Sequence, residues 1–235
     1  MRQRARRSAQ TLGAMQIAIV NVIGIALALA GCDTQPDRAI SATLTVQAGT
    51  SSSPAEIVLA QKIISARLDQ FLTEPQSTIT SNAEGKSLHF DFHGIPPDER
   101  TVTLLAKTPG ELRLSLANFV GEAWITDSDI EDARLVRTDQ GAMMDVHLGQ
   151  TAGQRLFALT SKNVGRAIQL RWNGELIMTA TSQSPFGETF QFSAPTPPDG
   201  LIMRVILQHG RLPITVESAE YRLAPNKSLE RTREE

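Results

Sequence analysis

The order of hydrophobic periods in the first half of the chain is the feature that most constrains its fold. A period of two residues predicts a strand with one buried face, and a period near 3.6 residues predicts an amphipathic helix. The periods predict, in order, strand 41–49, helix 54–72, strands 78–81 and 87–93, helix 97–107 and strand 111–117. This order is that of the ferredoxin-like split βαβ unit, so we expect an α+β fold with such a base.

Local signals support these elements. Ser53-Pro54-Ala55-Glu56 is a capping box with proline in the first helical position, which predicts where the first helix begins. In residues 87–93, Leu88, Phe90 and Phe92 share one side and are expected to face the core.

The second half predicts a further α+β region before a last strand. Asn173-Gly174 joins two alternating runs and is the strongest short hairpin signal in the chain. Thr151-Ala152-Gly153-Gln154 is read as a second capping box that opens a helix. The other expected elements are a hairpin of 134–138 and 142–148 around Asp139-Gln140-Gly141, the two runs 168–172 and 175–180, a strand at Phe190 and Phe192, helix 198–209 ended by Gly210, and strand 214–221.

The N-terminal segment has the parts of a secretory signal peptide. Four arginines and no acidic residue precede an uncharged, mostly apolar run at residues 17–30, and Leu29-Ala30-Gly31-Cys32 follows. As a helix the run would cover only about 21 Å, less than the ~30 Å of bilayer hydrocarbon. The four residues Leu29 to Cys32 resemble the lipobox of bacterial lipoproteins, in which the cysteine is acylated.

We therefore expect signal peptide 1–31 and lipidation of Cys32, with membrane lipid as the partner of that residue. Residues 32–40 are expected to be a tether. An ordinary signal peptide with a chance cysteine is the alternative. We expect a cell-envelope protein that is lipid-anchored to a membrane and faces the periplasm. Asp33 resembles the inner-membrane retention signal of enteric lipoproteins, which suggests the inner membrane.

Composition excludes several classes of site. A single cysteine among 235 residues allows no internal disulfide and no zinc site built from several thiolates. Removing the four arginines of the signal peptide from 23 Lys and Arg leaves 19 against 25 Asp and Glu, a net charge of −6. This balance gives no electrostatic reason to expect nucleic acid as a partner.

Two polar clusters contain residue types that can bind metal ions. His89, Asp91 and His93 lie on one face of their strand, but the two histidines are about 13 Å apart, too far to ligate one ion, so a solvated face is favoured. The acidic cluster at residues 127–132 lacks the glycine and glutamate of a calcium-binding EF-hand loop, which favours a capped turn. No nucleophile, metal or phosphate motif occurs. We expect no enzyme activity and no cofactor.

Several short motifs occur in this chain in the same order as in a known protein family. Phe157-Ala158-Leu159-Thr160, Asn163-Val164-Gly165 and Asn173-Gly174 resemble the first periplasmic domain of SecD, a membrane subunit of the bacterial protein-export machinery. The remaining pieces, which extend the resemblance over about residues 41–225, are Arg67-Leu68-Asp69 with Glu74-Pro75, Lys107-Thr108 through Leu114, Gly210-Arg211-Leu212-Pro213 and 217–225.

The resemblance implies a ferredoxin-like base at 41–115, a head subdomain at 116–212 inserted before a last base strand at 213–223, and a charged tail at 224–235. It also implies a head that moves relative to the base and contacts secreted polypeptides or translocon components. The family's glycine between the positions of Phe71 and Leu72 is missing. We expect no transmembrane helices after the domain, and therefore none of the family's proton-coupled transport. Binding of a small molecule or lipid within the same fold is the alternative function.

Overall fold

The computed structural model describes residues 41–117, 123–139, 141–195 and 197–224. The predicted signal peptide, the whole tether with Cys32 and Asp33, and nearly all of the charged tail lie outside these residues. The predictions for those segments therefore stay predictions.

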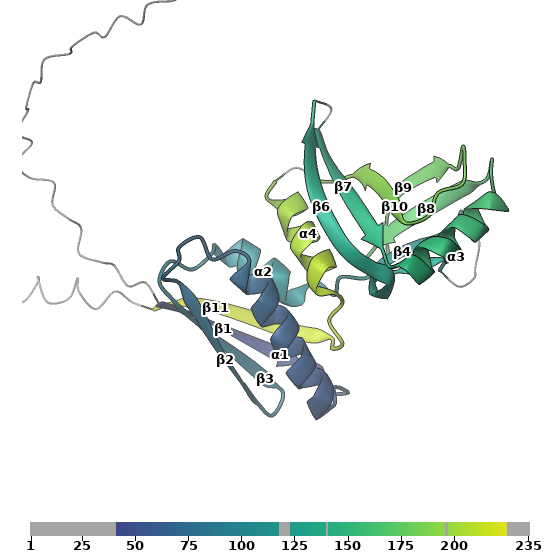
Figure 1. Cartoon of the computed structure of the whole chain (residues 1–235). Coiled ribbons are helices and arrows are strands. Elements are labelled where there is room, and N and C mark those ends of the chain that lie inside the picture. The colour runs from purple at the N-terminus through teal and green to yellow at the C-terminus, as the bar shows by residue number, and fades with distance from the viewer. Residues whose placement is uncertain (1–40, 118–122, 140, 196, 225–235) are drawn as a thin grey trace, which may run out of the picture. The chain divides into compact units, whose positions relative to one another are not determined.

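The first sheet, here called the base, has strand order β11-β1-β3-β2, and each neighbouring pair is antiparallel. This is the strand order of a ferredoxin-like unit. Helices α1 and α2 cover one face of the sheet (Figure 1). The base elements are β1 (Ser41–Ala48), α1 (Pro54–Asp69), β2 (Thr78–Glu84), β3 (Ser87–His93), α2 (Glu99–Lys107) and β11 (Val216–Leu223).

Several local predictions for the base are confirmed. Ser53 caps α1, and its backbone and hydroxyl groups exchange hydrogen bonds with Glu56 as a capping box requires. Leu88, Phe90 and Phe92 are buried on the helix-covered face of β3. Helix α1 ends at Asp69, three residues before the predicted end.

The strand predicted at residues 111–117 was placed wrongly. It forms β4 (Leu112–Leu116), which pairs with β5 and β8 and contributes nothing to the base sheet. The fourth strand of the base sheet is β11, the last strand of the chain, which pairs with β1. An alternating pattern fixes which side chains are buried, but it does not say which strand lies alongside.

The residues between α2 and β11 form two further antiparallel sheets, here called the head, with helix α3 beside them (Figure 1). One sheet has the order β10-β7-β6 and the other β5-β4-β8-β9. The elements are β5 (Ile125–Thr126), the short helix η1 (Asp127–Asp129), β6 (Ile130–Thr138), β7 (Gly141–Leu148), α3 (Gln150–Ser161), β8 (Ala167–Trp172), β9 (Glu175–Thr181) and β10 (Thr189–Ser193).

Two turn predictions for the head had different outcomes. Asn173 and Gly174 have φ values of 49° and 84° and form the tight β8–β9 turn, as predicted. The Thr151 capping box is wrong, because α3 begins at Gln150 with Gly149 as its N-cap. The Gly149 carbonyl accepts the first helical hydrogen bond, from the Gly153 N–H at 2.8 Å.

Helix α4 (Asp199–His209) contributes to both hydrophobic cores. Ile202, Val205 and Ile206 are buried in the core of the base, whereas Met203 and Leu207 belong to the core of the head. Trp172, at the end of β8, also packs against both. Since apolar contacts reach it from two sides, α4 joins the base and the head into one folded body.

Candidate functional site

A hollow of about 300 Å³ lies in the head, between the four-stranded sheet and the segment that leads from β9 into β10. Its apolar side chains come from β4, β8 and β9 and from Phe186 and Phe190. Its polar members are Thr181, Ser182, Gln183, Ser184, Thr189 and Gln191. An apolar lining with a few polar groups is typical of a surface that binds an apolar side chain or a small apolar molecule.

Thr160 on α3 fixes the segment that borders this hollow. Its buried hydroxyl donates to the Phe186 carbonyl at 2.9 Å and accepts from the Phe186 N–H at 3.1 Å. Gly153 lets the same segment approach α3, since a Cβ there would meet the Glu188 Cγ at 2.6 Å. The backbone of Phe186 is therefore held against α3.

A second hollow of about 510 Å³ adjoins the first, because both are lined by Phe186 and Thr189. It runs along α3 beside Phe157, a phenylalanine that is 54% exposed. Apolar surface at the head thus continues from one hollow to the next. The sequence motifs pointed to the region of Phe157, but not to Phe186 or the hollows.

The two segments that connect base and head meet at Arg67. This residue of α1 is fully buried, and its guanidinium donates to the carbonyls of Leu105, Thr108 and Pro109 on the way to the head. It also donates to the carbonyl of Gly210 on the return. Burial lowers the pKa of Arg67 to about 10, so the guanidinium is still charged at neutral pH.

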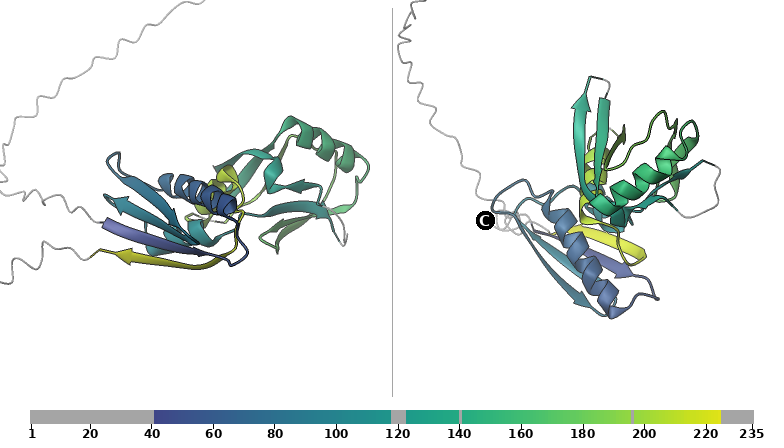
Figure 2. Two further views of the ribbon diagram at one scale, coloured as in Figure 1. Left: turned by 90° about the horizontal axis from the view of Figure 1, so that it is seen from below. Right: turned by 45° about the vertical axis from the view of Figure 1, so that its right-hand side comes forward.

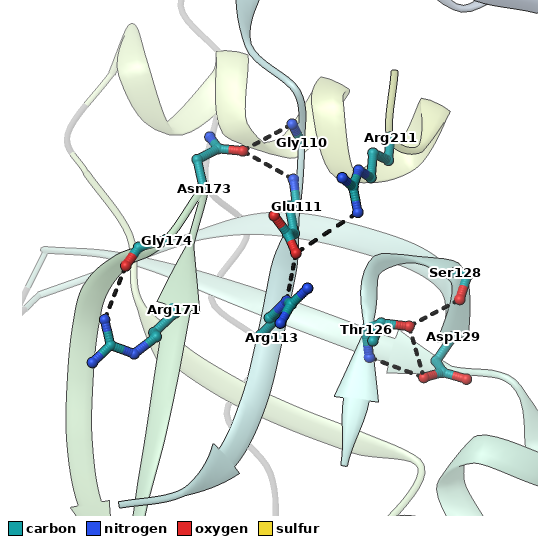
Figure 3. Close-up of polar contacts among 10 residues, drawn as sticks. All are labelled: Gly110, Glu111, Arg113, Thr126, Ser128, Asp129, Arg171, Asn173, Gly174 and Arg211. Atoms are coloured by element: carbon teal, nitrogen blue, oxygen red, sulfur yellow. Dashed lines mark hydrogen bonds and ion pairs between the residues drawn. The ribbon is translucent and has the colours of Figure 1, made fainter. Parts of the chain in front are cut away.

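Figure 3 shows how the head holds the outgoing segment. The Asn173 side-chain oxygen accepts hydrogen bonds from the N–H groups of Gly110 at 3.0 Å and Glu111 at 2.9 Å. The Glu111 carboxylate pairs with Arg113 and, at 3.7 Å, with Arg211 on the return segment. The two connections are also bonded directly, since the Leu212 N–H donates to the Pro109 carbonyl at 2.8 Å.

The acidic cluster forms a capped turn, as predicted. The Asp129 carboxylate accepts from the Thr126 N–H at 2.9 Å (Figure 3) and pairs with Arg155 at 2.7 Å. Burial raises the pKa of Asp129, but the hydrogen bonds from Thr126 and Arg155 outweigh it and leave the pKa below its usual value. Burial raises the pKa of the neighbouring Asp127.

The polar face of β3 carries no metal-binding arrangement. His89 Nδ1 lies 3.3 Å from the Thr45 hydroxyl, and His93 is exposed. Within the described residues, no group of three or more His, Cys, Asp or Glu side chains is placed to hold a metal ion. No helix in the described part of the chain is both long enough and apolar enough to cross a bilayer.

No protein family matches this sequence by its sequence profile, and no curated protein matches it either. Solved structures of SecDF do match by fold. One is SecDF in the super-membrane-facing form: the alignment covers 79% of this chain and 30% of the SecDF chain, with a TM-score of 0.66 and 13% identical residues.

Another is described as a membrane component SecDF that enhances protein export. It aligns over 75% of this chain and 98% of the solved chain, with a TM-score of 0.59 and 12% identity. This chain spans about 30% of the longer SecDF chain. The expected fold is thereby confirmed: an α+β domain with antiparallel sheets, like part of SecDF.

Proposed function

We propose that this chain is a lipid-anchored, non-enzymatic protein of the bacterial cell envelope, whose head binds polypeptide during or after export. The SecDF fold supports the link to export, because one SecDF structure is described as a component that enhances it. The basic start, the apolar run and the single cysteine after Leu-Ala-Gly support the anchor at Cys32.

The hollow in the head is the observation that carries the binding role. An extended polypeptide offers apolar side chains and unpaired backbone groups together. Leu170 and Met178 line the apolar part of the hollow, while Gln183 and Gln191 provide amide groups beside it. The adjacent β9 is the edge strand of its sheet, and Leu176 on it is 51% exposed. An edge strand beside an apolar hollow is suited to an added extended segment.

A small apolar molecule or lipid tail is the second candidate occupant. The hollow of about 300 Å³ lies at the lower end of the size range of ligand pockets, which supports this alternative. Such a ligand would be recovered with the protein from membranes, whereas a transient polypeptide would require crosslinking.

Site-specific photocrosslinking in cells tests the polypeptide role. A photoreactive residue at Gln183, which lines the hollow, should capture secreted chains or translocon subunits. The matched control is Arg171 on β8, which does not line the hollow and whose side chain donates to the Gly174 carbonyl. Equal adducts from both positions, or adducts from neither, would contradict binding in the hollow.

The anchor has a separate test. Cys32→Ser should abolish acyl labelling and release the protein from membranes, because each buried CH₂ of an acyl chain contributes about 0.8 kcal/mol to membrane binding. Membrane retention of the variant would refute an anchor at Cys32.

A further inference from the structure

Both ends of the described chain leave the base at the same end of its sheet. Ala42 is paired with Leu223, and the Ala224 N–H donates to the Ser41 carbonyl at 2.8 Å. Figure 2 shows the start of β1 and the end of β11 side by side. The start of β2 and the end of β3 lie there too, because His93 is in register with both Ser41 and Thr78.

The chain length before this end limits its distance from a membrane anchor. Cys32 precedes Ser41 by nine residues, and a chain of that length spans at most about 30 Å when fully extended. An acylated Cys32 would therefore keep this end of the sheet within about 30 Å of the lipid surface. This step depends on the proposed function, because it requires the acyl chain.

The side chains at this end suit a lipid surface. Two large apolar residues are exposed there: Ile95, which is 46% exposed just after β3, and Leu223, which is 61% exposed at the end of β11. They lie near the two opposite edges of the sheet. The Ile95 N–H donates to Ser77 just before β2, whereas Leu223 is on β11 and is paired with Ala42 on β1.

The turns at this end are uncharged, although Asp98 and Glu99 act on the nearby Tyr221 and Arg222 is paired with Thr43. The segments 41–43, 75–78, 92–97 and 223–224 contain no Lys, Arg, Asp or Glu. At the opposite end of the sheet, Glu84 and Lys86 lie at the β2–β3 turn and Glu217 lies at the start of β11. Ionised side chains resist entry into a bilayer, whereas leucine and isoleucine favour it, so Ile95 and Leu223 are the groups at this end that would enter the interface.

We propose that this end of the base sheet is a membrane-contact surface, and that Ile95 and Leu223 enter the interface of the bilayer to which Cys32 is anchored. The acyl chains supply the affinity and the two apolar side chains fix the orientation. The β2–β3 turn with Lys86 then points away from the lipid.

Lipid quenching of a fluorophore tests this orientation. The full lipidated protein is reconstituted in phosphatidylethanolamine and phosphatidylglycerol vesicles, with or without brominated lipid. Acylation uses up the only native thiol, so a cysteine introduced by Ser41→Cys or Lys86→Cys is the single labelling site. We expect at least about twofold stronger quenching at position 41 than at position 86, since interfacial side chains lie ~5–10 Å deep.

The double variant Ile95→Asp and Leu223→Asp, labelled at position 41, tests the two side chains themselves. Both are exposed, so the core is preserved, and quenching should fall to the level at position 86. Unchanged quenching would overturn their role. Equal quenching at 41 and 86, with acylated Cys32 confirmed by mass spectrometry, overturns the orientation and leaves the anchor standing. Unmodified Cys32 overturns the anchor, and this inference with it.

Discussion

The guanidinium of Arg67 donates a hydrogen bond to the carbonyl of Gly210, 143 positions later in the sequence, at the point where the chain returns from the head. The same side chain bonds the outgoing segment at Leu105, Thr108 and Pro109. One buried arginine thus satisfies backbone carbonyls on both connections between base and head. Few other donors could do this, because only a guanidinium offers five N–H groups in a fixed plane.

Replacing Arg67 by methionine should destabilise the protein by about 3 kcal/mol or more, because buried carbonyls lose their donor. Arg67→Lys keeps the charge but offers a single ammonium, so its loss should be intermediate. Urea denaturation followed by circular dichroism measures both. The control is Arg100→Met, which removes an exposed ion pair with Asp199 and should cost under about 1 kcal/mol. An equal loss for Arg67→Met and Arg100→Met would show that the buried bonds contribute little.

Gly110 lies against Arg67 and should not tolerate a side chain. It has φ of +90°, and an added Cβ would meet Ile206 at 2.7 Å and the Arg67 guanidinium at 2.9 Å. Gly174 has a similar φ of +84° but open space around it, so it is the matched control. Gly174→Ala should cost about 1–2 kcal/mol from the backbone alone, and Gly110→Ala should cost a further 1–3 kcal/mol from overpacking. Similar melting temperatures for the two variants would contradict the close packing.

Much of the base could be predicted from local patterns, because each of its elements carries its own signal. The capping box at Ser53, the alternation in β3 and the Asn173-Gly174 turn are all decided by residues close in sequence. The partner of β4 could not be predicted in this way. Its alternating leucines fit either sheet equally well, and the choice depends on packing against β8, some 55 residues away.

The role of Arg67 as a buried donor to both connections between base and head was not predicted, although the sequence contains one signal for it. It falls three residues after Ile64 and seven after Ala60, on the stripe of α1 that faces the core. An arginine on an apolar stripe indicates a buried cation that needs acceptors. The hollow at Phe186 had no such signal, because its side chains come from two sheets and an intervening segment.

Asn173 should stabilise the outgoing segment through its side-chain oxygen. Its φ of 49° is favourable for glycine, so Asn173→Gly keeps the turn and removes only the acceptor for the N–H groups of Gly110 and Glu111. We expect a loss of about 1–3 kcal/mol, since two part-buried N–H groups lose their acceptor. Hydrogen exchange should accelerate at those two amides. Unchanged protection of both amides would mean that the side-chain oxygen does not hold them.

His209, the last residue of α4, should make stability depend on pH just below neutrality. Burial lowers its pKa below 6.5, the positive charges of Arg67 and Arg204 lower it further, and Asp69 opposes them. Between the folded-state pKa and about 6.5, the unfolded chain binds the proton more readily, so stability falls as the pH falls through this range. In His209→Gln this loss of stability at lower pH should disappear. The difference in unfolding free energy between the wild-type protein and His209→Gln should therefore be constant above about pH 7.5 and change steadily below about 6.5. Unfolding free energies measured from pH 5 to 8 provide the check, and high salt should weaken the part due to the arginines but not the part due to burial. A difference that stays constant over the whole range would show that His209 does not resist protonation in the folded protein.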